Sequence, residues 1–156
     1  MFTVRPLAAF DIDGILDLNA GTPEAARWPR EAYESYLDGE EADPARQIFI
    51  AEKQGELVGY IAGRMAVDVC ELEAIAVSGT ARRGGIGKAL LDALAAWART
   101  KPALQVQLEV RAGNDSAINF YCNAGFHRDG VRPGYYQRPD EDAVLMSLPL
   151  ERVREG

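Results

Sequence analysis

The sequence contains few of the residues from which metal sites and disulfide frameworks are built. Its 156 residues include two cysteines, Cys70 and Cys122, and one histidine, His127. A disulfide scaffold requires more cysteines, and a zinc site requires several Cys or His ligands at spacings such as CxxC or HExxH. We therefore predict no metal and no disulfide framework, two cysteines packed in the core, and a reducing cytoplasm as the compartment.

The chain also lacks a long hydrophobic run and an excess of positive charge. No stretch approaches the ~18 consecutive apolar residues of a membrane span, and Asp11 and Asp13 interrupt the N-terminal segment before a signal-peptide core develops. With 17 Lys and Arg against 24 Asp and Glu, the formal net charge is −7. Nonspecific nucleic-acid binding requires a cationic surface. The sequence thus predicts neither a membrane nor a nucleic acid as a partner, and a cationic partner fits better.

What is present is the composition of a folded domain. Hydrophobic residues make up 47% and charged residues 26% of the chain, close to the average of globular proteins. A chain of this length can bury one core but is too short for two ordinary domains. We expect a single domain over residues 1–150 and a short tail over 151–156, in a protein that is a monomer or a weak dimer.

Hydrophobic periodicity predicts a mixed α/β sheet with helices on both faces. The expected strands are 2–7, 47–52, 57–65, 70–77, 104–111 and 142–150, and the turn "KQGE" joins the second and third as a hairpin. The expected helices are near 8–20, 29–38, 85–100 and 114–125. In the last helix, Asn114 or Asp115 is the expected N-cap, and Gly125 is the glycine that ends it.

Two of the expected strands have informative patterns. The strand at 104–111 alternates throughout, with Leu104, Val106, Leu108 and Val110 on one face and Gln105, Gln107, Glu109 and Arg111 on the other. In "CELEAIAV" the alternation lapses, because all residues from Ala74 to Val77 are apolar. A β-bulge or a fully buried strand end would explain this lapse.

A glycine-rich loop, "SGTARRGGIGKALL", lies between the strand at 70–77 and the helix at 85–100. It is not a P-loop, because Arg82 stands where the first glycine is required and Ala89 where Ser or Thr is required. It is not a dinucleotide fingerprint either, because Leu90 stands at the third glycine position. Both nucleotide motifs are therefore excluded.

The pattern that remains is R-x-x-G-x-G, from Arg82 to Gly87. Glycines let backbone amides approach an anion, a helix N-terminus adds about half a positive charge, and arginines supply further donors. These features favour a pyrophosphate ligand. A glycine-rich turn with a basic surface is the alternative interpretation of the loop alone.

The segment "IAVSGTARRGGIGKALL" resembles the acetyl-coenzyme A motif, Q/R-x-x-G-x-G/A, of the GNAT superfamily of N-acetyltransferases. Further on, "LEVRAGNDSAINFYCNAGF", followed by "GYY" and "EDAVLMSLPL", resembles the ribosomal-protein alanine N-acetyltransferases, and the likeness spans roughly residues 45 to 150. The resemblance implies a GNAT fold, a mostly antiparallel twisted sheet of about six to seven strands. It also implies acetyl-CoA as cosubstrate and the N-terminus of a protein, such as a basic ribosomal protein, as acceptor.

The resemblance also assigns coenzyme contacts. Backbone groups of Ile75, Ala76 and Val77 would face the pantetheine arm. The pyrophosphate would be held by the loop residues Arg83, Gly84, Gly85, Ile86, Gly87 and Lys88. Asn114 would both cap its helix and touch the coenzyme. The chain departs from the motif at Ala81, where a bulkier residue is common, and at Gly84, where a polar residue is common.

By the same resemblance, Glu109 is the base and Tyr121 the acid of a direct acetyl transfer in a ternary complex. The two are separated by twelve residues, with Asn114 between them, as the resemblance requires. Such a transfer needs no covalent nucleophile, so the lack of a Ser or Cys constellation is compatible with it. Without the motif, Glu109 would be a carboxylate on a solvated strand face and Tyr121 a packing residue.

Three aromatic residues are candidates for acceptor binding. Tyr135 and Tyr136 are expected on a loop before the last strand, where the family clasps a peptide backbone. Trp28, between the first two helices, would form the opposite wall. Ordinary packing is the alternative role for all three.

The acceptor class stays open at this stage. At neutral pH roughly a tenth of an α-amine is uncharged, against less than a thousandth of a lysine, which favours a protein N-terminus. A small-molecule amine acetyltransferase is one alternative, because the same fold accepts many substrates. A coenzyme-binding sensor without turnover is the other, and the presence of both Glu109 and Tyr121 argues against it.

Overall fold

The computed structural model describes residues 1–137 and 140–151, so that all of the expected tail except Glu151 lies outside the described residues. Its strands are β1 (Thr3–Pro6), β2 (Arg46–Lys53), β3 (Glu56–Ala66), β4 (Val69–Val77), β5 (Gln105–Arg111), β6 (His127–Tyr136) and β7 (Glu141–Pro149). Its α-helices are α1 (Ile12–Ala20), α2 (Arg30–Glu34), α3 (Ile86–Arg99) and α4 (Asp115–Asn123). Single 3-10 turns span Ala9–Asp11, Gly39–Glu41 and Gly79–Ala81.

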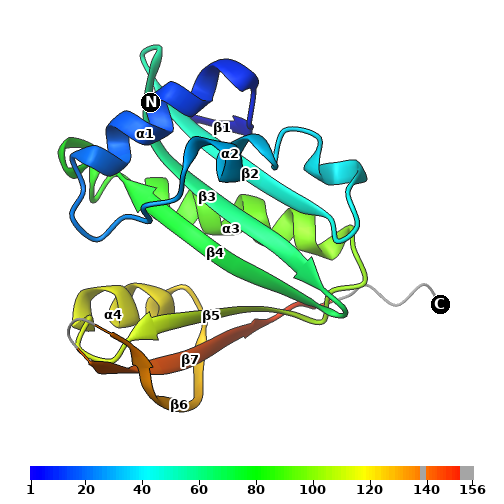
Figure 1. Ribbon diagram of the computed structural model, residues 1–156, viewed down its shortest axis with the longest axis vertical. Helices are drawn as coiled ribbons and strands as arrows, with labels where there is room; N and C mark the ends of the chain where they lie inside the picture. The colour runs from blue at the N-terminus through cyan, green and yellow to red at the C-terminus, as the bar shows by residue number, and fades with distance from the viewer. Residues whose placement is uncertain (138–139, 152–156) are drawn as a thin grey trace.

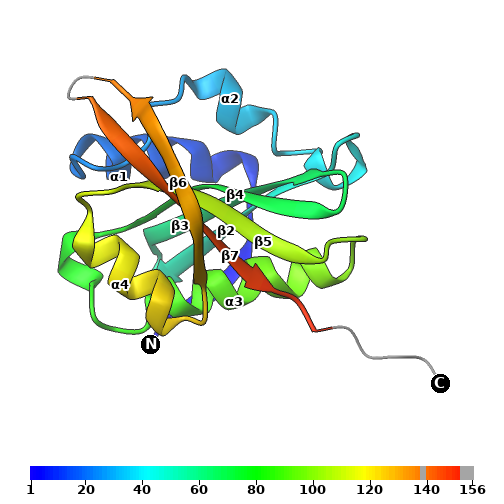
Figure 2. The same ribbon diagram turned by 90° about the horizontal axis from the view of Figure 1, so that it is seen from below.

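The strands form one twisted seven-stranded sheet in the order β1-β2-β3-β4-β5-β7-β6. Every neighbouring pair is antiparallel except β4 and β5, which are parallel. Helices α1 and α2 lie on one face, and α3 and α4 on the other (Figure 2). This architecture confirms the predicted GNAT-type α/β fold.

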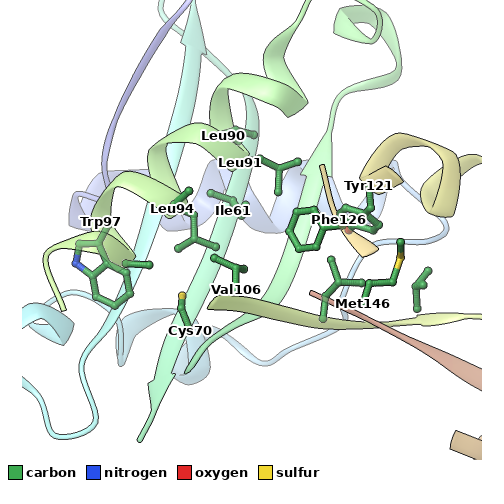
Figure 3. Packing of buried hydrophobic residues seen from close by; sticks show 14 of the residues in the cluster. Ile61, Cys70, Leu90, Leu91, Leu94, Trp97, Val106, Tyr121, Phe126 and Met146 are labelled. Atoms are coloured by element: carbon green, nitrogen blue, oxygen red, sulfur yellow. The ribbon is translucent and has the colours of Figure 1, made fainter. Parts of the chain in front are cut away.

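Each face of the sheet carries its own hydrophobic core. On one face, Ile12 and Ile15 of α1 and Tyr33 of α2 pack with Ile48 and Tyr60 of the sheet. On the other face α3 buries an apolar stripe, Ile86, Leu90, Leu94 and Trp97. Figure 3 shows Leu90, Leu94 and Trp97 of this stripe near Ile61, Cys70 and Val106. Helices thus cover both faces of β3, whereas a ligand can reach the sheet where two strands separate.

Such a separation lies between β4 and β5. Their parallel ladder joins Val69 to Gln105, Cys70 to Val106 and Glu71 to Gln107. Beyond this ladder the two strands diverge toward the N-terminus of α3 and toward α4 (Figure 1). Among the described strands, the one parallel pair is therefore also the place where the sheet opens.

A β-bulge at Glu73 accompanies this divergence and confirms one of the two explanations of the lapsed alternation. Leu72 pairs with Gly63 and Ala74 pairs with Ala62, so that Glu73 is the extra residue of β4. After the bulge, Ala74 and Ala76 pack in the core under α1, whereas Ile75 and Val77 pack in the core under α3. Residues on both faces of the strand end are thus apolar.

Strand β6 is a correction to the sequence-based prediction, which placed Tyr135 and Tyr136 on a loop. The segment "HRDGVRPGYY" pairs with β7 at the edge of the sheet, and all its residues before Tyr136 are exposed. An exposed edge strand needs no apolar face and tolerates Pro133, and its register shifts break the pattern further. The alternation of hydrophobic and polar residues therefore does not predict this strand.

Two smaller predictions are also wrong. Leu104 precedes β5 and is 59% exposed, and Ala103 is buried in its place, because the chain is still turning before the strand begins. Helix α2 ends at Glu34 rather than near residue 38, and turns follow it.

Candidate functional site

A cavity of about 680 Å³, here called the first cavity, opens between the diverging ends of β4 and β5. It brings together most of the residues predicted to bind the coenzyme or to act on it: Ile75, Ala76, Val77, Arg83, Gly85, Ile86, Gly87, Lys88, Glu109, Asn114 and Tyr121. Gly84 is exposed nearby but is not among the described residues that line it. The sequence motif and the sheet opening therefore mark the same place.

The glycine loop directs the start of α3 into this cavity. Gly85 is the N-cap of α3 and has a left-handed backbone, with φ of 81°, and Arg83 is also left-handed, with φ of 70°. A Cβ atom at Gly85 would meet no atom within 4 Å, so the space in front of the helix is open. Unpaired backbone amides and the helix dipole thus face the cavity, with Arg83 and Lys88 in its lining.

Gly87 has a packing role that the motif alone did not show. A Cβ atom there would lie 2.9 Å from Cζ of Phe120 on α4. Because glycine has no Cβ atom, the first turn of α3 can approach α4 closely. Gly87 therefore helps to set the width of the cavity in addition to its predicted role beside the coenzyme.

Arg82 forms contacts that hold the loop between α1 and α2 beside the cavity. Its guanidinium lies 3.5 Å from the carboxylate of Glu24, and its Nε donates to the carbonyl oxygen of Val77 at 3.4 Å. The loop contributes lining residues that the sequence analysis did not identify: Thr22, Glu24, Ala25 and Ala26. The sequence carries no signal for them, because they reach the site only through the tertiary fold.

The caps of α4 fix the position of Tyr121. The side chain of Asn114 accepts a hydrogen bond from the Ala117 amide at 3.2 Å, which confirms it as the N-cap. At the other end Gly125 is left-handed, and the amide of Phe126 donates to the Tyr121 carbonyl at 3.0 Å. This glycine-terminated end brings the Phe126 ring beside Tyr121, at 5.5 Å between centroids (Figure 3). Tyr121 is 7% exposed, and burial raises its pKa to about 12.

A second cavity of about 560 Å³ adjoins the first. Its lining includes the acidic residues Glu71, Glu73, Glu109 and Asp129, together with Arg132, Tyr135 and Tyr136. The two cavities share Leu72, Glu73, Leu108 and Glu109. They therefore meet between β4 and β5, with one carboxylate on each strand.

Glu109 is held by residues of β6. Arg132 Nη1 lies 3.3 Å from its carboxylate, and hydrogen bonding to Glu109 raises the pKa of Tyr135. The Arg132 guanidinium stacks on the Tyr135 ring at 4.9 Å, and Tyr136 lies 5.0 Å from Tyr135 between ring centroids. On the polar face of β5, Glu109 therefore takes part in a network of polar and aromatic contacts. The residues of this network come from β6, the strand that the sequence did not predict.

Trp28 lies away from this network. It is partly buried and packs on Tyr33 and Tyr36, at centroid distances of 5.2 and 6.1 Å. It is not among the described residues that line either cavity. Its role as an acceptor wall stays a prediction.

Within residues 1–137 and 140–151, no group of three or more His, Cys, Asp or Glu side chains is arranged to hold a metal ion. Among the same residues, no helix combines the length and the apolar character that crossing a membrane requires.

Comparisons with known proteins agree with this geometry. The sequence model of the acetyltransferase (GNAT) family matches residues 12–126. An N-alpha-acetyltransferase of Sulfurisphaera tokodaii is 36% identical over 163 residues, covering 96% of this chain and 93% of that protein. The N-alpha-acetyltransferase RimI of Mycobacterium tuberculosis is 36% identical over 123 residues, covering 76% and 73%. The crystal structure of the ribosomal-protein-S18-alanine N-acetyltransferase from Escherichia coli superimposes with a TM-score of 0.82 at 26% identity, covering 100% of this chain and 98% of that one.

Proposed function

This chain belongs to the acetyltransferase (GNAT) family, and from that premise we propose that it transfers the acetyl group of acetyl-CoA to the N-terminal α-amine of a protein. The observation that supports this most is the meeting of two different cavities at Glu109. One cavity has the loop and helix start that suit a coenzyme. The other has an acidic lining that suits a cationic acceptor.

The first cavity fits coenzyme A in its chemistry. Arg82, Arg83 and Lys88 surround the open N-terminus of α3, a combination that suits a pyrophosphate. Between the strands, the lining changes to apolar side chains that suit a pantetheine arm: Leu72, Ile75, Val77, Leu108 and Phe120. The ladder with β5 ends at Glu71, so beyond it the backbone groups on that edge of β4 can bond to amides of the pantetheine arm.

The second cavity fits an amine that carries positive charge. At neutral pH most of an α-amine is protonated, and four carboxylates against one arginine attract that form. Relatives of this chain are named for N-terminal or ribosomal-protein alanine acetylation. We therefore propose a protein N-terminus as the acceptor, and a basic ribosomal protein as its class. We also propose the cytoplasm as the place of action. Of the two cysteines expected in the core, Cys70 is buried, whereas Cys122 is exposed, which corrects that expectation.

In the proposed reaction Glu109 faces the attacking nitrogen and receives a proton from it, directly or through a water molecule. Tyr121 faces the first cavity, where the departing sulfur would lie. Complete transfer of a proton from a phenol with this raised pKa to a thiolate whose acid has a pKa near 8.5 would be uphill by roughly 5 kcal/mol. Tyr121 is therefore assigned to stabilise the departing sulfur as a hydrogen-bond donor.

The acceptor class can be tested with two peptides of the same sequence. One begins with a free alanine or serine, and the other is blocked at its N-terminus and carries an internal lysine. We expect acetylation of the first and no measurable acetylation of the second, because only the α-amine is appreciably uncharged near pH 7. Mass spectrometry of the products locates the acetyl group. Equal transfer to both peptides would contradict the proposal, and transfer only to polyamines or aminoglycosides would indicate a small-molecule enzyme.

Replacing Tyr121 by phenylalanine is expected to lower kcat by about 10- to 100-fold, since one hydrogen bond to a developing charge is lost. The loss should be the same from pH 6 to pH 9, because a group with a pKa of about 12 stays protonated over that whole range. Phenylalanine retains the ring that packs on Phe120 and Phe126. Turnover at the wild-type rate would exclude Tyr121 from the reaction.

A further inference from the structure

Glu73 occupies a position that neither the sequence motif nor the proposed function uses. It is the extra residue of the bulge in β4, at the point where β4 turns away from β5. Among the described residues, only two charged side chains line both cavities, and these are Glu73 and Glu109. The two carboxylates therefore stand on opposite walls of the junction through which an acceptor amine would approach the acetyl group.

The two carboxylates differ in their surroundings. The charge of Glu109 is balanced by Arg132 at 3.3 Å. Within the described part of the chain, no cationic side chain lies within 4 Å of the Glu73 carboxylate. Glu73 is also exposed, which Glu109 is not. Among the described residues, Glu73 is thus the carboxylate of the pair that has no close ion pair, and it is the more exposed of the two.

The groups around Glu73 come from several elements. Glu71 lies on the same strand, Arg64 on β3 and Arg46 on β2, and Tyr36 follows α2. Partial loss of hydration and the proximity of Glu71 raise the pKa of Glu73, and the two arginines oppose this shift. The raised pKa makes Glu73 a stronger proton acceptor than an ordinary surface carboxylate.

The other groups nearby belong to the acceptor side. The negative charges of Glu109 and Glu73 both raise the pKa of Tyr135 on β6. Asp129 and Arg132 complete the charged lining of the second cavity. A cation that entered this cavity would therefore meet Glu73 and Glu109 together.

Acetyl transfer from a thioester to an α-ammonium releases two protons from the same nitrogen. The first must leave before attack, because the protonated amine has no free electron pair. The second leaves after the carbon–nitrogen bond has formed, as the carbon–sulfur bond breaks and the sulfur becomes a thiol. One of the two protons ends on that sulfur and the other passes to solvent, so two proton acceptors beside the nitrogen have separate tasks.

On the basis of the proposed function, we propose that Glu73 is a second catalytic residue, which binds the acceptor's α-ammonium and removes its first proton before attack. Glu109 receives the second proton on the opposite wall. Because Glu73 is exposed, it can return its proton to solvent between turnovers. This division of tasks explains why two carboxylates occupy the only junction of the two cavities.

The test compares Glu73→Gln with the wild type on a peptide that has a free N-terminal alanine. At pH 6.5, where the α-amine is charged, the variant is expected to lose about 10-fold or more in kcat/KM. By pH 9, where the amine is already neutral, the difference should disappear. Glu56→Gln removes the same charge from an exposed site at the start of β3 and should follow the wild-type profile at every pH.

A binding measurement separates this proposal from the proposed function. With the protein saturated with coenzyme A, Glu73→Gln should weaken calorimetric binding of the free-amine peptide about 10-fold at pH 6.5 and leave an N-acetylated peptide unaffected. An unchanged pH profile with unchanged binding, or a loss of equal size at every pH, would overturn the role of Glu73. Failure of the wild type to acetylate the peptide would instead overturn the choice of acceptor, and the binding result would still decide the role of Glu73.

Discussion

Replacing Gly85 by aspartate is expected to abolish measurable coenzyme A binding while the fold persists. Gly85 is the left-handed N-cap of α3, and the space in front of it is open. Aspartate tolerates this backbone better than most residues and is a favourable N-cap, so the helix should survive. Its carboxylate, however, would stand where the phosphates are expected. At about 4 Å, each pair of like charges near a protein surface costs roughly 1 to 4 kcal/mol, so the two charges of a pyrophosphate correspond to a loss of about 30-fold or more.

The matched control is Gly85→Asn, which has the same shape and the same tolerance of a left-handed backbone but no charge. Calorimetric titration with coenzyme A should show a modest loss for asparagine and no binding for aspartate. Thermal unfolding of both variants checks that the fold is retained. If aspartate and asparagine bind the coenzyme equally well, the phosphates lie elsewhere.

Glu109→Gln is expected to reduce kcat by about 10²- to 10⁴-fold, the range typical of a positioned acid–base group. Glutamine keeps the shape of the side chain and its ability to accept a hydrogen bond from Tyr135. Coenzyme affinity should therefore stay close to that of the wild type. Raising the pH should restore part of the loss, because hydroxide from the solvent can then take the proton that Glu109 would otherwise receive. Steady-state kinetics from pH 6 to pH 9, with separate calorimetry for coenzyme A, measures both effects.

Because Arg132 pairs with Glu109, its removal is a useful comparison. Arg132→Gln leaves the Glu109 carboxylate in place but removes the ion pair between β5 and β6. It therefore tests whether Glu109→Gln lowers kcat only because that ion pair is lost. A loss in Arg132→Gln as large as that in Glu109→Gln would assign the effect to this contact. Wild-type turnover by Glu109→Gln across the whole pH range would leave proximity as the source of the rate.

The parts of the fold that the sequence predicts are those in which side chains alternate between protein and water. The apolar stripe of α3 and the hairpin of β2 and β3 follow such patterns. The ends of α4 are predicted for another reason, because Asn114 and Gly125 are residue types that favour the two ends of a helix. Strand β6 does not, because an exposed edge strand is held by its backbone ladder to β7 rather than by an apolar face. Local periodicity contains no information about such a ladder.

The candidate site divides in the same way. Most residues of the proposed coenzyme side belong to one contiguous motif, from Ile75 to Lys88, so the sequence alone groups them, and they line one cavity. The acceptor side is assembled from residues far apart in the chain, such as Glu73 and Arg132. Pairing of Arg132 with Glu109 depends on the ladder between β6 and β7. Glu73 is the extra residue of a bulge, which was one of two explanations that the sequence pattern left open. These features arise from register and tertiary packing.

The short ladder between β4 and β5 also links the stability of the fold to its ligand. Among the described strands, those from β1 to β4 and those from β5 to β7 are joined in the sheet by this one ladder. A molecule that fills the first cavity adds contacts with both halves and so binds the folded chain but not the unfolded one. At a free concentration of about 100 times its Kd, such a ligand raises the free energy of unfolding by about 2.7 kcal/mol. In a cell, the lifetime of this chain as a folded protein would therefore rise and fall with the supply of the coenzyme.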